Sequence, residues 1–217
     1  MNYTLVLILS ASILLAAVIG WIRFNRIDPA YYPFIFCVWI ASVNEIVSFF
    51  FSRYGINTAI NNNIYVLIES ILLAYLFKSW TVFMESSLIY YLILIIFILA
   101  WMFENVVWGS IWQIKSYFRI FYSFIIVVVS IHYNNKLFFS LTDKYTSNTA
   151  FLLCTGFIIY FTYKILIEAF WLWGSGATRN FRIKLYLLST WINLFVNLIY
   201  AIAMLWIPRK PQHITVS

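Results

Sequence analysis

The sequence predicts an all-α integral membrane protein, a bundle of about seven transmembrane helices. Of the 217 residues, 64% are hydrophobic and only 10% are charged, against roughly 25% charged residues in soluble globular proteins. The apolar residues are gathered in segments of about 20 residues, the length needed to cross a bilayer. No segment alternates apolar and polar residues with a period of two, which excludes a membrane β-barrel.

The apolar segments are separated by short stretches that contain turn formers, charges or both. The first segment has no Lys or Arg before it, so we expect a helix there rather than a cleaved signal peptide. The fourth segment has the least defined boundary, and six or eight helices remain alternatives. The seven segments cover about 3–22, 31–52, 62–80, 86–104, 116–134, 148–172 and 183–207. The whole chain, 1–217, is therefore predicted to be a single polytopic domain that ends in a short basic tail, 208–217.

The basic residues predict the orientation of the bundle. Cytoplasmic loops carry an excess of Lys and Arg, and one set of loops with the tail holds seven such residues against six on the other side. The first segment decides between them, because Arg23 and Arg26 follow it directly. We predict an N-terminus outside and a C-terminus in the cytoplasm.

Composition also limits the partners. The net charge of +7 is expected at lipid headgroups, and no basic face indicates nucleic-acid binding. Cys37 and Cys154 lie inside apolar segments and are expected to pack there. The two histidines have no partners at ligand spacing, so we expect no metal and no cofactor. The sequence contains no catalytic motif, so no residue is assigned a catalytic role and a protein without enzymatic activity is favoured.

Sorting the segments into faces at 100° per residue places polar residues on one side of five of them. The first and fourth segments lack such a stripe and are predicted at the periphery. The charged residues on the stripes form a candidate ligand-binding or ion-pair cluster: Glu45, Glu69, Arg119, Lys164 and Glu168. The supporting polar residues are Asn44, Tyr65, Tyr160, Asn193 and Asn197.

The charges share one depth and require partners. Glu45 and Glu69 each lie about seven residues from the predicted outer helix ends, roughly 10 Å deep. An ionised group near the bilayer centre costs roughly 2.5–3.5 kcal/mol, so five unpaired charges would cost on the order of 10–15 kcal/mol. Lys164 precedes Glu168 by four residues, the poorer order for an intrahelical pair, which favours Glu45 or Glu69 as its partner. Three acids against two bases leave one negative charge, for a proton, a cation or a ligand with a positive group.

These features favour a receptor- or sensor-like module that binds a small polar or cationic ligand in its outer half, with a separate signalling partner at the cytoplasmic loops. A small solute or proton-coupled transporter of three plus one plus three helices is the alternative, although no proline interrupts a segment interior. A structural or assembly subunit is a third candidate. The fourth is an intramembrane lipid-acting enzyme with Glu45 and Glu69 as acid and base.

Overall fold

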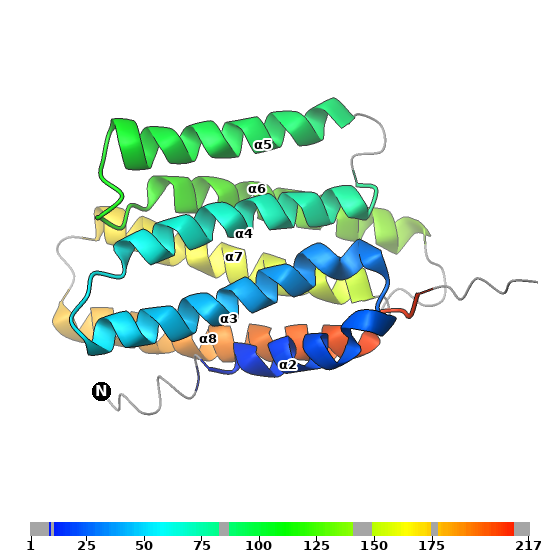
Figure 1. Cartoon of the computed structure of the whole chain (residues 1–217). Helices are drawn as coiled ribbons and strands as arrows, with labels where there is room; N and C mark the ends of the chain where they lie inside the picture. The colour runs from blue at the N-terminus through cyan, green and yellow to red at the C-terminus, as the bar shows by residue number, and fades with distance from the viewer. Residues whose placement is uncertain (1–8, 10, 83–86, 141–148, 175–177, 211–217) are drawn as a thin grey trace, which may run out of the picture.

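A computed structural model describes residues 9, 11–82, 87–140, 149–174 and 178–210, and these residues form seven α-helices and no β-strand. The helices run side by side and alternate in direction (Figure 1). In chain order they are α2 (Ile13–Arg23), α3 (Tyr32–Arg53), α4 (Ala59–Ser79), α5 (Ser87–Met102), α6 (Tyr117–Ser140), α7 (Thr149–Trp173) and α8 (Arg179–Trp206). The predicted all-α fold is confirmed.

Among the described residues, six helical stretches are long and apolar enough to cross a membrane. They are Pro29–Arg53, Ala59–Ser79, Leu88–Val107, Tyr117–Phe139, Thr149–Trp173 and Asn180–Trp206. Only α2 represents the predicted first segment, 3–22, because residues 1–8 and 10 lie outside the described part of the chain. The seventh span therefore stays a prediction.

The helix ends extend into polar sequence further than hydropathy indicated. Helix α8 begins at Arg179 rather than at 183, because the Thr178 side chain accepts a hydrogen bond from the Phe181 amide and caps the helix. Helix α4 begins at Ala59 rather than at 62, and its first turns carry the run Asn61–Asn63. Helix α5 continues into a π-helical turn, Phe103–Val107.

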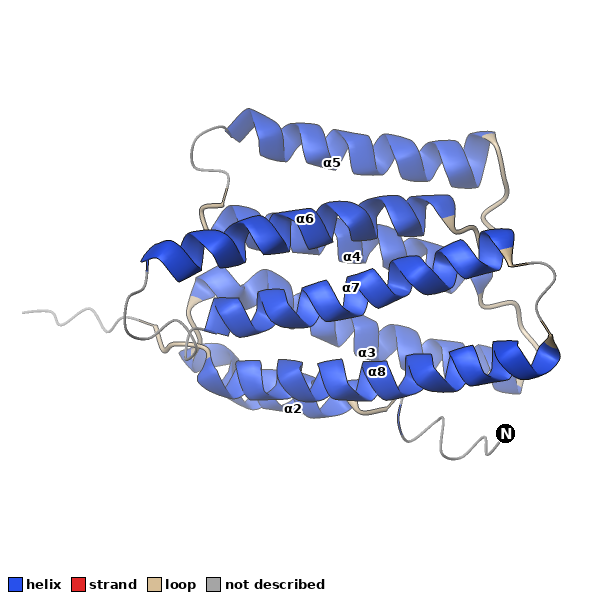
Figure 2. Ribbon diagram, turned by 180° about the vertical axis from the view of Figure 1, so that it is seen from behind, coloured by secondary structure: helices blue, strands red, loops and turns tan. Residues whose placement is uncertain are grey.

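Six helices form a closed ring in the order α2, α3, α4, α6, α7, α8, and each packs against the next. Helix α5 packs outside this ring against α4 and α6, and it lies at one edge of the molecule in both views (Figures 1 and 2). The prediction of a peripheral fourth segment is thus confirmed. The first segment was wrongly placed at the periphery, since α2 closes the ring between α3 and α8.

Small residues explain why α2 fits into the ring. Ala16, Ala17 and Gly20 are buried on one face of α2, and small residues let helix backbones approach closely. Arg23 at the end of α2 donates hydrogen bonds to the carbonyls of Met204 and Ile207 at the end of α8. These bonds satisfy carbonyl groups that a helix C-terminus leaves without intrahelical partners.

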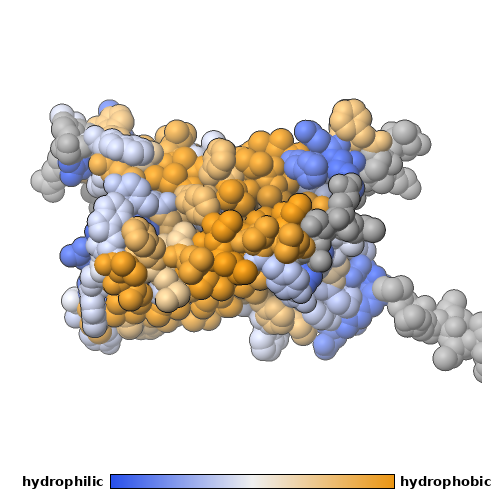
Figure 3. Space-filling view, turned by 90° about the horizontal axis from the view of Figure 1, so that it is seen from above, coloured by the Kyte–Doolittle hydropathy of each residue, from blue (hydrophilic) through white to orange (hydrophobic). Residues whose placement is uncertain are grey.

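The outer surface carries an apolar belt. Large exposed hydrophobic side chains occur on every helix of the bundle. On the face over α5, hydrophobic residues fill the middle of the molecule and hydrophilic residues gather toward both ends (Figure 3). A belt of this kind is what lipid contact requires, so the protein has the architecture of a multi-pass membrane protein.

The two halves of the ring interior differ in chemistry. The half that contains the start of α3 and the end of α8 holds an aromatic cluster of Phe34, Phe77, Phe157 and Tyr200, all buried. Their ring centroids are 6.0 Å apart for Phe34 and Phe157 and 5.4 Å apart for Phe34 and Tyr200. We call the other half, where α3 ends and α4 begins, the polar half. The aromatic cluster fills the interior of one half of the ring. The charged residues surround the space that remains in the other half.

Candidate functional site

A central cavity of about 190 Å³ lies inside the ring and is lined by residues from all six of its helices. Phe34, Phe157 and Tyr200 of the aromatic cluster form its floor. The polar lining residues are Asn44, Glu45, Asn62, Tyr65, Glu69, Arg119, Tyr160, Lys164, Asn193 and Asn197. Nine of the ten residues predicted for the site thus border one space, and the tenth, Glu168, lies beside it as the partner of Arg119.

The centre of the cavity wall is an ion pair between Lys164 of α7 and Glu69 of α4. Lys164 Nζ lies 3.0 Å from Glu69 Oε2. The Tyr65 hydroxyl donates to Glu69 Oε1 at 2.6 Å, and the Tyr122 hydroxyl donates to Oε2. Lys164 also donates to the Tyr122 hydroxyl, and its ammonium lies 5.4 Å from the ring centroid of Tyr160. The buried carboxylate therefore has the charge partner and the hydrogen bonds that burial demands.

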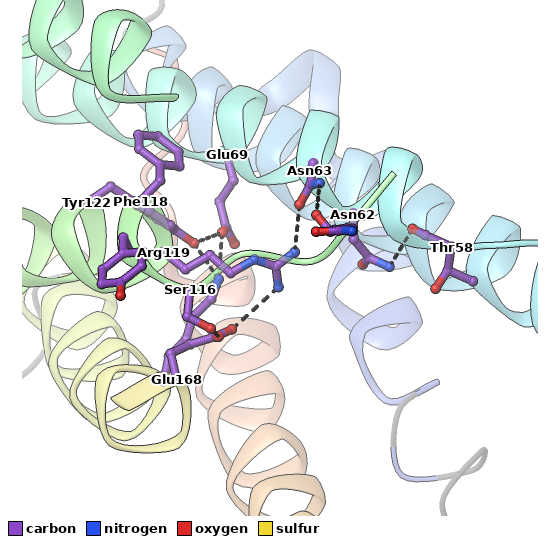
Figure 4. A network of polar contacts seen from close by, with 12 residues as sticks. Thr58, Asn62, Asn63, Glu69, Ser116, Phe118, Arg119, Tyr122 and Glu168 are labelled. Atoms are coloured by element: carbon purple, nitrogen blue, oxygen red, sulfur yellow. Dashed lines mark hydrogen bonds and ion pairs between the residues drawn. The ribbon is translucent and has the colours of Figure 1, made fainter. Parts of the chain in front are cut away.

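A second ion pair joins α6 to α7. Arg119 Nη1 lies 3.4 Å from Glu168 Oε1, and the Ser116 hydroxyl donates to Glu168 Oε2 at 2.5 Å. The other end of the guanidinium donates to Asn63 Oδ1 of α4 at 3.4 Å. Figure 4 shows Arg119 reaching between Asn63 and Glu168. Arg119 thus connects three helices through two long hydrogen bonds.

The depth of the cluster differs from the prediction. Because α4 begins at Ala59, Glu69 lies ten residues into a helix of 21 residues, roughly 15 Å from its start. The Lys164–Glu69 pair is therefore close to the middle of the bundle. Arg119 is the third residue of α6, so the Arg119–Glu168 pair lies nearer to the end of the bundle. The charges occupy two levels and not one band.

Glu45 differs from the other acids of the cluster. It lines the cavity but is exposed, and within the described part of the chain it forms no hydrogen bond or ion pair. Glu69 and Glu168 use the two cations, so the negative charge in excess belongs to Glu45. This acid stands at the edge of the cavity, where helical phase alone could not tell whether a neighbouring helix covers it.

Some of the supporting polar residues form hydrogen bonds between helices, and others line the cavity. Asn61 Nδ2 donates to Asn44 Oδ1 at 2.8 Å, and Asn44 Nδ2 donates to Asn62 Oδ1 at 3.4 Å, which joins α3 to α4. Asn197 Nδ2 donates to the Ser12 hydroxyl at 2.8 Å, which joins α8 to the start of α2. Tyr160 and Asn193 line the cavity.

Two residues with structural roles near the site were missed in the sequence. Glu104 at the end of α5 is buried and accepts hydrogen bonds from the amides of Tyr117 (3.0 Å) and Phe118 (2.6 Å) at the start of α6. Asn63 Nδ2 donates to the carbonyls of Ile111 and Gln113 at 3.0 and 2.9 Å. Both residues fix the connection between α5 and α6, which carries Ser116 and Arg119. No local sequence pattern indicated Glu104, because it lies more than ten residues before the start of α6.

A second cavity of about 730 Å³ lies at the polar end, beside the connection between α5 and α6. Arg119 borders both cavities. The lining residues are Glu104, Trp108, Ile114, Lys115, Ser116, Tyr117, Arg119, Glu168, Trp171 and Leu172. No group of three His, Cys, Asp or Glu residues that could hold a metal ion occurs in the described ranges.

No family model matches the sequence, and no curated protein or solved structure matches it either.

Proposed function

We propose that the protein is a receptor- or sensor-like membrane module that binds a small ligand in the central cavity. The observation that carries this proposal is a polar cavity lined by all six helices of the ring. A ligand held there touches every helix of the ring, so its binding alters their packing directly. In this proposal the chain works as a single transmembrane domain, and a separate partner at the cytoplasmic loops receives the change.

The packed aromatic cluster on one side of the cavity favours binding over passage. Phe34, Phe77, Phe157 and Tyr200 are buried and pack ring against ring beneath the cavity. A carrier needs access to its site from both sides in turn, often through interrupted helices. Both Pro29 and Pro33 lie at the start of the first candidate span, and Pro208 follows the last. The buried aromatic cluster and the absence of proline from the middle of the candidate spans support a site that is reached from the polar side.

Size and charge indicate the class of ligand. A dry cavity of roughly 150 Å³ in another protein accommodates benzene, so about 190 Å³ suits a molecule of that size. Lys164 and Arg119 already pair with Glu69 and Glu168, which leaves Glu45 as the free charge at the cavity. We expect the ligand to carry one positive group that pairs with Glu45.

The orientation of the bundle in the membrane is part of the same proposal. With the N-terminus outside, the polar half faces the exterior and the aromatic half faces the cytoplasm. The ligand then arrives from outside, and Arg23, Arg26, Arg209 and Lys210 lie at the cytoplasmic headgroups.

Binding of benzylammonium, with benzyl alcohol as its uncharged counterpart, tests the proposal. The full chain in a neutral detergent is titrated with each compound by calorimetry. We expect the cation to bind and Glu45→Gln to weaken it about tenfold, the value of one charge-assisted hydrogen bond. Asp28→Asn removes the same charge at the other end of the bundle, where Asn can still cap the turn that Asp28 begins, and should leave binding unchanged.

Three results would overturn parts of this proposal. Binding of neither compound removes the small-ligand site. Equal affinity of wild type and Glu45→Gln removes Glu45 as the counter-charge. Uptake of benzylammonium into liposomes that contain the protein, lost in Glu45→Gln, replaces the sensor by the transporter alternative.

A further inference from the structure

The cavity of about 730 Å³ at the polar end is larger than the central cavity and has a different composition. Its walls come from the end of α5, the connection between α5 and α6, the start of α6 and the end of α7. The proposed small-ligand site does not use it, apart from the shared border at Arg119.

The hydrogen-bonding groups of this cavity leave a cationic donor free. The Glu104 carboxylate accepts two backbone amides, and the Glu168 carboxylate accepts Ser116 and Arg119. Lys115 also lines the cavity, and its ammonium forms no hydrogen bond or ion pair with any part of the chain that the structure describes. An ammonium offers three donors and no acceptor. The free capacity at this cavity therefore suits an anion.

The charges around this cavity are also compatible with an anionic ligand. Lys115 and Arg119 balance Glu104 and Glu168 within the lining. Arg182 of α8 adds a positive charge next to it, with its guanidinium carbon 6.0 Å from the ring centroid of Trp171. The two carboxylates already accept hydrogen bonds from the start of α6, from Ser116 and from Arg119, so neither of them is left uncommitted to repel an incoming anion.

Apolar walls distinguish this cavity from a site for a soluble anion. Trp108, Ile114 and Trp171 line it, and 64%, 53% and 52% of their respective surfaces are exposed. Trp171 is two residues from the end of α7, at the level where tryptophan gathers at the membrane–water interface. A free basic group beside exposed apolar rings matches an amphiphile with an anionic head and an apolar body.

We propose that this cavity binds the phosphate headgroup of an anionic membrane lipid. Lys115 contacts the phosphate, and Trp108, Ile114 and Trp171 hold the glycerol and the upper part of the acyl chains. The site fixes one lipid against the connection between α5 and α6, next to the Arg119–Glu168 pair.

The test uses the full chain in a neutral detergent and a short-chain phosphatidylglycerol. Short-chain phosphatidylcholine and inorganic phosphate are titrated separately, and tryptophan fluorescence and the thermal midpoint are recorded. We expect phosphatidylglycerol to bind, and Lys115→Gln to weaken it about tenfold, because a hydrogen bond to a charged group is lost. Lys115→Arg should retain binding.

Lys184→Gln is the matched control, since Lys184 is exposed on α8 at the same end of the bundle and outside the cavity. An equal loss in Lys115→Gln and Lys184→Gln would show diffuse surface attraction and overturn the site. Equal affinity for phosphatidylcholine would overturn its preference for an anionic lipid. Binding of inorganic phosphate as tight as that of the lipid would assign the cavity to a soluble anion instead.

Discussion

Lys164 pairs with Glu69 of α4 and not with Glu168, which lies one turn away on its own helix. Helix α6 separates α4 from α7 in the ring, so this ion pair crosses the ring interior. Tyr122 of α6 joins it by hydrogen bonds to both charged groups. The pair thus ties three helices together at the central cavity.

Glu69→Gln should destabilise the protein strongly. It leaves the Lys164 ammonium among Tyr122, Tyr160 and Phe161 without a counter-charge, and breaking a buried pair costs about 3–5 kcal/mol. The double substitution Glu69→Gln and Lys164→Gln removes both charges and should recover part of this loss. Equilibrium unfolding in mixed micelles measures both values.

A double-mutant cycle of Lys164→Gln and Glu168→Gln is the control for that prediction. These residues share no ion pair, so the coupling energy between them should be smaller than that between Lys164 and Glu69. A coupling between Lys164 and Glu168 as large as that between Lys164 and Glu69 would contradict the geometry.

Part of the fold and part of the site follow from hydropathy and helical phase alone. Hydropathy is enough to place the long helices, because lipid demands about 20 apolar residues in a row. Helical phase brings Glu69, Arg119 and Lys164 to one interior space, because polar groups cannot face lipid. The order of Lys164 and Glu168 indicated a partner on another helix. These inferences depend on local periodicity and on the bilayer, which act on each segment separately.

Other features depend on how segments meet. Glu104 caps α6 only because a connection of more than ten residues returns the chain to it, and no periodicity encodes that return. Helix α2 joins the ring through Ala16, Ala17 and Gly20, which hydropathy does not distinguish from a lipid-facing surface. The exposure of Glu45 likewise depends on which helices stand beside it.

Gly156→Ala should destabilise the contact between α7 and α8. An added Cβ would lie 2.8 Å from Tyr200 Cε1, and Tyr200 is buried in the aromatic cluster. Overpacking of this kind costs about 1–3 kcal/mol. Gly20→Ala is the matched control, because its Cβ would meet the flexible end of Met204 at 3.3 Å, while both substitutions gain about 1 kcal/mol of helix propensity. Thermal unfolding should show a lower midpoint for Gly156→Ala alone. Equal midpoints for the two variants would contradict overpacking against Tyr200.

Glu104→Ala should fray the start of α6. The carboxylate accepts hydrogen bonds from the Tyr117 and Phe118 amides, and loss of a helix cap costs about 0.5–2 kcal/mol. Glu104→Gln keeps an acceptor oxygen and should cost less. Hydrogen exchange at the amides of Tyr117 and Phe118 should accelerate most in Glu104→Ala, and unchanged exchange would exclude the cap.

Single cysteines at opposite ends of the bundle test the proposed orientation. Tyr54→Cys places a thiol after α3 at the polar end, and Arg209→Cys places one after α8 at the other end. Both positions are exposed, whereas the native Cys37 and Cys154 are buried and should not react. With the polar half outside, a membrane-impermeant maleimide should label Tyr54→Cys in intact cells and Arg209→Cys only after lysis. The reverse pattern would place the polar half and both cavities on the cytoplasmic side, because the two thiols lie at opposite ends of the bundle.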